Sequence, residues 1–234
     1  MIPWNEFEGY REVRSYPATF DEQRFSRDVL REAASKAMVM FRGWPFIAVL
    51  NKSQVTEGTL VVGDRIETVI DRNRLGGYLH FELWRLRRSG LFFHKSLMDE
   101  ETYEAALKRG RMLDYTATIY HVSEAIGSLW RLYESLGVPD DEVITIEFRY
   151  TGMQGRHLGS WEPRDLFFST EYVCQSPVIE HRKAMSLGLW RATDAQHAAD
   201  VCLEIFHEMQ WLDAGRDQIA RVSGDFLSKV RFSA

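Results

Sequence analysis

Residues 78–97 alternate between apolar and polar side chains with a period of two, and this pattern constrains the fold more than any other. The run YLHFELWRLRR (78–88) is followed by the dipeptide Ser89-Gly90, and LFFHKSL (91–97) then returns. One face of the first run carries Tyr78, His80, Glu82, Trp84 and Leu86, and the other carries Leu79, Phe81, Leu83, Arg85 and Arg87. Two alternating runs about a two-residue turn are typical of an antiparallel hairpin, so the chain must build a sheet.

Apolar residues at helical spacing predict three long helices at about 22–41, 114–136 and 195–212, with a weaker one at 217–230. Asp21 and Asp194 are expected to cap the first and third of these, and Gly137 to end the second. Further strands are expected at 45–50, 59–71 and 143–150, with one or two more between 156 and 179, and a turn at Gly76-Gly77.

These elements predict one α+β domain over residues 1–234, with a mixed or antiparallel sheet and long helices packed against it. Residues 1–20 contain scattered aromatic side chains and are expected to form an extended lead-in that packs onto the domain.

Composition narrows the class of protein. With 29 basic and 34 acidic residues the net charge is −5, which disfavours a dedicated nucleic-acid binder. Cys174 and Cys202 are the only cysteines and suit neither a disulfide framework nor a zinc site. The N-terminus lacks the apolar stretch of a signal peptide, and no run reaches the ~20 apolar residues of a membrane span. We therefore expect a cytoplasmic protein that has no contact with a membrane.

Sequence motifs of the common enzyme classes are missing. The chain contains no HExxH, GxSxG, Walker A or GxGxxG pattern, so no metal and no cofactor is expected. His80 and Glu82 on one strand face allow general acid–base work or form an ordinary polar pair on a solvated face. Cys174 and Cys202 are expected to be packed residues rather than nucleophiles.

The hairpin and its neighbourhood carry an excess of positive charge. From Arg72 to Lys95 there are six basic residues and one acid, Glu82. Aromatic side chains, Trp84 among them, interleave with the arginines, and such a surface holds phosphates and stacks bases. The alternative is a sheet edge that charge keeps from aggregating. The binding candidates are Arg72, Arg74, Trp84, Arg85, Arg87 and Arg88.

A second candidate is the loop TGMQGR (151–156), where two glycines lie close to Arg149 and Arg156. Glycine lets backbone approach a ligand and arginine binds phosphate, but a ligand-free turn explains the same residues. By contrast, residues 193–217 hold six acids and one base, Arg216. A basic hairpin and an acidic helix in one molecule favour self-association or docking to a charged protein partner.

Three stretches of the chain resemble the C-terminal region of bacterial ATP-binding proteins related to Schlafen. The shared residues are Leu132, Tyr133, Leu136, Gly137 and Val138; Ile146, Glu147, Arg149, Gly152, Gly155, Arg156 and Leu158; and Trp84, Arg85, Leu86, Arg88, Gly90 and Phe92. The resemblance covers about residues 40–210, and the N-terminal Schlafen/Alba-type domain of that family has no counterpart here. It implies a bacterial, cytoplasmic accessory or sensor-type module.

Three functions remain open at this point. The first is a non-enzymatic accessory or sensor-type binding module of a bacterial regulatory or defence-type system that acts through protein contacts. The second is a nucleic-acid or nucleotide-phosphate binder that uses the hairpin arginines. The third is a hydrolase or nuclease without a recognisable motif.

Overall fold

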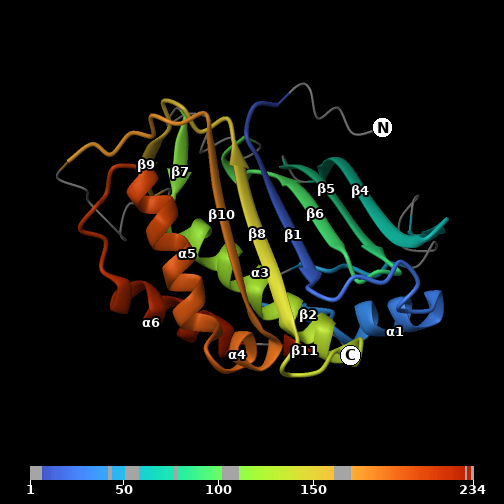
Figure 1. The fold of residues 1–234 in the computed structure, drawn as a ribbon. Coiled ribbons are helices and arrows are strands. Elements are labelled where there is room, and N and C mark those ends of the chain that lie inside the picture. Colours follow the sequence, from blue (N-terminus) through green and yellow to red (C-terminus); the bar gives the residue numbers. More distant parts are fainter. Residues whose placement is uncertain are drawn as a thin grey trace.

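A seven-stranded antiparallel sheet organises the chain (Figure 1). The computed structural model describes residues 7–41, 44–50, 58–75, 78–101, 111–160, 170–229 and 231–232, with the backbone alone for 71–75, 78–80 and 231–232. The strand order is β10-β8-β1-β6-β5-β4-β3. The strands are β1 (Tyr10–Pro17), β3 (Thr59–Val62), β4 (Arg65–Leu75), β5 (Tyr78–Arg87), β6 (Phe92–Leu97), β8 (Val143–Thr151) and β10 (Val178–Ser186).

Two short strand pairs complete the β structure. β2 (Val39–Met40) pairs antiparallel with β11 (Arg231–Phe232), and β7 (Met112–Asp114) pairs parallel with β9 (His157–Gly159). The helices are α1 (Arg27–Lys36), α3 (Tyr115–Ser135), α4 (Leu187–Ala192), α5 (Asp194–Glu208) and α6 (Arg216–Leu227), with a 3-10 turn η2 (Asp99–Glu101). Helices beside a largely antiparallel sheet make this an α+β fold, as expected.

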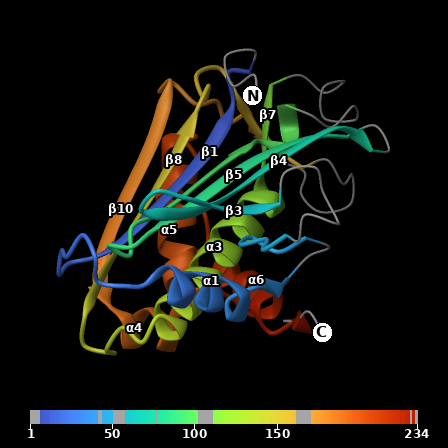
Figure 2. The same cartoon turned by 90° about the vertical axis from the view of Figure 1, so that its right-hand side faces the viewer.

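In the part of the chain that the structure describes, α1, α3 and α6 gather on one side of the sheet (Figure 2). Side chains on that inner face are buried, Val13, Trp84 and Phe92 completely, and they join α3 and α5 in one apolar cluster. The other side of the sheet faces away from these helices, and we call it the open face. Period-two alternation therefore separates an apolar inner face from a charged open face.

The three long helices lie where they were predicted, but the first and the third are shorter than predicted. α3 starts at Tyr115 because the Asp114 side chain accepts a hydrogen bond from the Ala117 amide, 2.7 Å away. The first predicted helix, 22–41, is wrong at both ends: the cap is Ser26 and not Asp21, and the helix ends at Lys36. The helix predicted at 195–212 ends at Glu208, and no side-chain cap bond forms at its start.

Two strand predictions need correction. Residues 44–50 contain no strand, although their apolar run suggested one. The single strand expected at 59–71 is a hairpin, because Gly63 takes a positive φ of 59° in a turn between β3 and β4. The turn predicted at Gly76-Gly77 lies outside the described residues. The hairpin of β5 and β6 is confirmed, with Trp84 opposite His94 in its register.

The largest correction concerns the N-terminal segment. Residues 1–20 were expected to form a lead-in, but Tyr10–Pro17 is β1, which lies between β8 and β6. β1 pairs with β6 of the hairpin on one side and on the other with β8, whose residues lie about 140 positions further along the chain than their β1 partners, such as Arg149 opposite Glu12. It consequently holds the two halves of the sheet together and supplies Arg14 and Tyr16 to the candidate site described next.

Candidate binding site on the open sheet face

The open face carries charged side chains in rows that run across the strands. Strand register aligns one row over six strands, and it consists of Arg182, Glu147, Arg14, Phe93, Arg85 and Glu67. A neighbouring row consists of Glu180, Arg149, Glu12, Lys95, Leu83 and Val69. Opposite charges therefore alternate from strand to strand over β10, β8 and β1.

Ion pairs hold this alternation in place. Glu12 is nearly buried and lies 3.3 Å from Lys95 and 3.5 Å from both Arg14 and Arg149. Arg149 also reaches Glu180 at 2.9 Å. Burial alone would lower the pKa of Arg149, but Glu12 and Glu180 outweigh burial and raise it. Arg149 therefore stays charged, and the opposite charges in these ion pairs offset one another.

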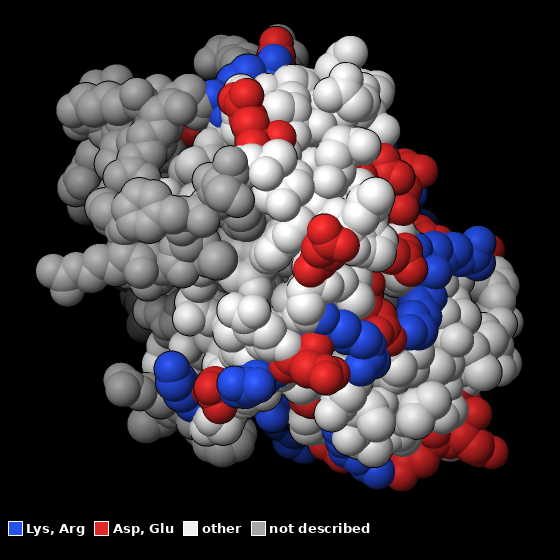
Figure 3. All heavy atoms as spheres, turned by 90° about the vertical axis from the view of Figure 1, so that its left-hand side faces the viewer, with Lys and Arg blue, Asp and Glu red and all other residues white. Residues whose placement is uncertain are grey.

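Seen from the side on which β10 and α5 lie, basic and acidic side chains again alternate in a band (Figure 3). Asp200 of α5 contacts both Lys183 and Arg216, and Glu204 contacts His181. The acidic stretch at 193–217 is thus neutralised in part by the chain's own cations. Asp200 is paired twice, whereas the Glu204 side chain stays 61% exposed, and docking through the acidic stretch stays a prediction.

The alternation breaks at one place, around Phe93. Arg14 and Arg85 flank Phe93 on the two adjacent strands, and the guanidinium of Arg14 lies 5.6 Å from the centre of its ring. A hollow of about 430 Å³ opens here. Its lining consists of Arg14, Tyr16, Arg85, Arg87, Leu91, Phe93 and Glu147. Three arginines face one carboxylate, so we call this the cationic hollow.

Each arginine of the cationic hollow is about half exposed and held in place by a neighbour. Arg85 lies 2.9 Å from Glu67, and Arg87 lies 3.6 Å from Asp64. Burial alone would raise the pKa of Glu67, but the guanidinium groups of Arg65 and Arg85 lower it overall. Glu67 is therefore ionised at neutral pH and fixes the direction of Arg85.

A second hollow of about 520 Å³ adjoins the first and shares Tyr16, Arg87 and Leu91 with it. It extends past the β5–β6 turn toward Phe20, whose side chain is exposed. Tyr16 stands between the two hollows, and its hydroxyl donates a hydrogen bond to Glu147 at 2.8 Å. Together the hollows form a continuous depression over the end of the sheet near the turn.

The hairpin arginines proposed from the sequence divide between this site and the scaffold. Arg85 and Arg87 line the cationic hollow. Arg88 lines the second hollow, where it donates hydrogen bonds to the Phe25 carbonyl at 2.9 Å and to Gln23 at 3.1 Å. The backbone of Arg72 and Arg74 lies in β4, but their side chains lie outside the described residues, as does that of His80.

Trp84 is not available as a binding residue. Its side chain is fully buried on the inner face, and its indole N–H donates to the Ala48 carbonyl at 2.9 Å. The reason is strand parity, because Trp84 and Arg85 point to opposite sides of β5. Phe93, on the open face opposite Arg85, is the aromatic residue that accompanies the arginines.

Arg156 is a structural residue and not a ligand-binding one. Its side chain is only 1% exposed and forms an ion pair with Glu101. It also donates to the Gly152 carbonyl at 2.7 Å and to the Met112 carbonyl at 3.2 Å. Gly152 has a φ of +63°, and a side chain there would clash with the Glu8 carbonyl. The TGMQGR loop is therefore a packed corner, which favours its ligand-free alternative.

A histidine–carboxylate pair lies beneath the sheet. Glu82 and His94 are buried on the inner face with 3.1 Å between Oε1 and Nε2, and the Phe46 ring stacks on the imidazole at 4.2 Å. The partner of Glu82 is thus His94 of the next strand. Glu82 therefore does not lie on a solvated face, as one interpretation of the sequence expected. A buried carboxylate cannot act as a solvent-accessible general base either.

Glu100 is the described acid with the most strongly shifted pKa. Its carboxyl group is fully buried and accepts a hydrogen bond from the Asp114 amide at 2.8 Å. Burial raises its pKa to about 7, with Asp99 acting in the same direction and Arg11 opposing. The folded state therefore binds the proton more tightly than the unfolded state, in which a glutamate titrates near 4.3.

This shift predicts that stability falls as pH rises from about 4 to about 7 and stays lower above that range. The Glu100 contribution to this loss should amount to roughly 4 kcal/mol, because one pKa unit corresponds to 1.36 kcal/mol. Glu100→Gln should gain stability relative to wild type as pH increases. Urea unfolding at pH 4.5, 6 and 8 measures this, with exposed Glu180→Gln as control. A pH-independent difference would contradict the prediction.

Both cysteines are buried and form no disulfide, which agrees with the expectation that they are packed core residues. Burial raises the pKa of the Cys174 and Cys202 thiols, which opposes formation of the reactive thiolate. Among the described residues no group of three or more His, Cys, Asp or Glu side chains is arranged to hold a metal ion. Within the same residues no helix has the length and apolarity to cross a membrane.

Comparison of the chain with protein-family models, with curated proteins and with solved structures finds no match.

Proposed function

We propose that this protein is a non-enzymatic accessory or sensor-type module that binds a partner protein through its open sheet face. The observation that supports this most is the open face itself, on which six strands align charged side chains in fixed rows. Side chains already held by ion pairs lose little further freedom on binding, and patterned charge selects a complementary partner.

The membership of this module in a bacterial, cytoplasmic regulatory or defence-type system belongs to the same proposal. It is supported by the three stretches similar to the accessory region of Schlafen-related proteins. The structure gives those stretches packing roles: Tyr133 bonds to Ser15 and to the Gly90 carbonyl, and Arg156 closes the corner of the TGMQGR loop. The similar stretches thus contribute to the scaffold, and their Arg85, Glu147 and Arg149 lie in the charged rows of the open face.

Binding of a long nucleic acid to this face is the second candidate, and the carboxylates argue against it. Glu147 and Glu67 flank the cationic hollow in the same row as Arg14 and Arg85. A polyphosphate backbone that crossed the strands would therefore pass close to acidic groups on both sides. The net charge of −5 opposes it further.

The test is charge reversal of Arg14, Arg85 and Arg87 together. We expect the triple Arg→Glu variant to bind a co-purifying partner, identified and then expressed in pure form, at least 30-fold more weakly. The variant also loses the partly exposed ion pairs with Glu12, Glu67 and Asp64, each worth about 0–1 kcal/mol, so its melting temperature should fall by several degrees while unfolding stays cooperative. The loss should be smaller in high salt, since salt screens exposed charges beyond roughly 10 Å at 0.1 M.

The matched control reverses three exposed cations on the helices, Arg31, Lys36 and Arg221. It makes the same change in net charge away from the open face and should leave binding within twofold. Equal losses in both variants would show a response to net charge alone and would overturn the proposal. Full binding by the open-face variant would overturn it as well.

A further inference from the structure

The cationic hollow has features of a small-molecule site that the surrounding charge rows lack. Three arginines and one carboxylate, Glu147, line it, and the carboxylates that hold the arginines, Glu12, Glu67 and Asp64, lie outside this lining. Its volume of about 430 Å³ falls within the range of about 300–1,000 Å³ that is usual for ligand pockets. The three guanidinium groups stay about half exposed, so an anion in the hollow can contact them.

The walls of the hollow add a flat apolar element. The Phe93 ring lies on the sheet surface between Arg14 and Arg85, and Leu91 and Tyr16 border it. Bases stack on aromatic rings presented in this way, and stacking contributes about 1–3 kcal/mol per base. A guanidinium group binds two phosphate oxygens at once, and the guanidinium groups of Arg85 and Arg87 line the same hollow.

The ends of the hollow limit the size of its ligand. Two hollows adjoin it, one past Tyr16 and Arg87 toward Arg88 and one past Arg14 and Glu147 toward Arg149 and Arg182. Carboxylates interrupt the arginines in both directions: Glu12, Glu147 and Glu180 on the β8 side, and Glu22 and Asp64 toward Arg88. A longer polyphosphate would therefore pass these acids, whereas one nucleotide can stay within the cationic hollow.

We propose that the cationic hollow binds a single nucleotide, with its base on Phe93 and its phosphate between Arg85 and Arg87. This inference rests on the proposed use of the open face for binding and names the small ligand that this face recognises. A nucleotide here lies within the surface that the partner protein would cover. Its binding therefore changes the charge that the partner meets, which is what a sensor-type module requires.

Isothermal titration of the whole chain with AMP, ATP, adenosine, ribose 5-phosphate and inorganic phosphate tests the proposal. We expect AMP or ATP to bind at least tenfold more tightly than adenosine, which lacks phosphate, and than ribose 5-phosphate, which lacks a base. Phe93→Leu should weaken nucleotide binding by tenfold or more and leave ribose 5-phosphate unchanged. Arg87→Gln should weaken both, whereas Arg31→Gln, exposed on α1 and away from the sheet face, should weaken neither.

Three results would overturn the proposal. Equal affinity for nucleotide and inorganic phosphate would show a simple anion site. Affinity that grows with the length of oligo-dT would show a surface for single-stranded nucleic acid. Absence of nucleotide binding would also end it, and if the triple Arg→Glu variant still lost its partner protein, the proposed function would stand without a nucleotide.

Discussion

Replacement of Arg156 by leucine is expected to lower the free energy of unfolding by about 3–5 kcal/mol, the usual cost of breaking a buried ion pair. The change removes the partner of Glu101, the guanidinium donor to the Met112 carbonyl and one of the two donors to the Gly152 carbonyl, the other being Arg111. Three segments of the chain meet at this guanidinium, so leucine, although similar in bulk, satisfies none of them. Urea unfolding monitored by tryptophan fluorescence measures the loss.

The matched control is Arg149→Leu, in which an arginine of the same loop region is removed from the open face. Its ion pairs are partly exposed to solvent, so the loss should stay below about 1 kcal/mol. Arg156→Lys should recover only part of the stability, because an ammonium group lacks the planar fork that reaches three acceptors. Equal stability of Arg156→Leu and Arg149→Leu would show that Arg156 is not a structural residue.

Elements whose signal is local could be predicted from the sequence. The hairpin of β5 and β6 has period-two alternation and a two-residue turn, and α3 has both an Asp cap and a continuous apolar stripe. β1 could not be found in this way, although YREVRSYP alternates in part. Its inner face carries Arg11 and Ser15, which bond to the Leu97 carbonyl and to Tyr133, both distant in sequence.

Only those residues of the candidate site that lie on a single element, the β5–β6 hairpin, could be predicted from the sequence. Arg85 and Arg87 follow from the hairpin, but Arg14 and Tyr16 reach the hollow because β1 pairs with β6. The aromatic residue of the site shows the same limit. Trp84 and Phe93 both lie among basic residues in the sequence, and only their positions on the strands decide that Phe93, and not Trp84, lies on the open face. Arg156 was misassigned because a glycine–arginine loop has the same sequence whether its arginine turns outward or into the core.

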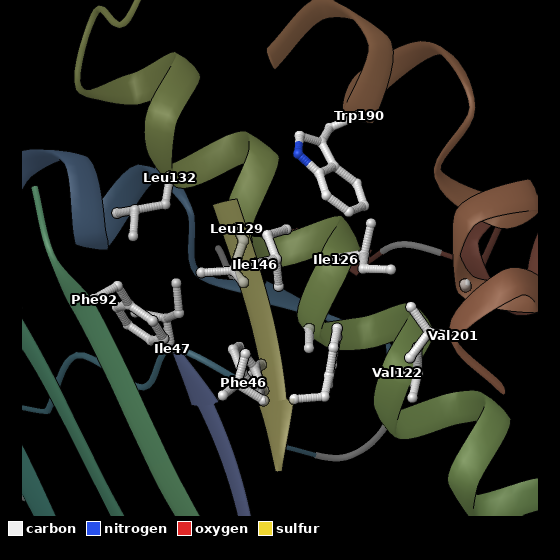
Figure 4. Packing of buried hydrophobic residues seen from close by; sticks show 14 of the residues in the cluster. Phe46, Ile47, Phe92, Val122, Ile126, Leu129, Leu132, Ile146, Trp190 and Val201 are labelled. Atoms are coloured by element: carbon white, nitrogen blue, oxygen red, sulfur yellow. The ribbon is translucent and has the colours of Figure 1, made fainter. Parts of the chain in front are cut away.

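Replacement of Ile126 by aspartate is expected to unfold the chain at 25 °C, because the new carboxylate enters the centre of the core. Ile126 lies on α3 with no solvent exposure, close to Trp190 and Val201 (Figure 4). An unpaired buried charge costs several kcal/mol, and the lost apolar contacts add about 2 kcal/mol. Together these approach the 5–15 kcal/mol that stabilise a domain.

Circular dichroism and heat-unfolding curves measure the result, and Ile205→Asp on α5 should behave alike, since Ile205 belongs to the same cluster. Leu189→Asp, half exposed on α4, and Ile126→Val, which removes one methylene, should both keep a cooperative transition. Wild-type melting of Ile126→Asp would mean that α3 does not form the centre of the core.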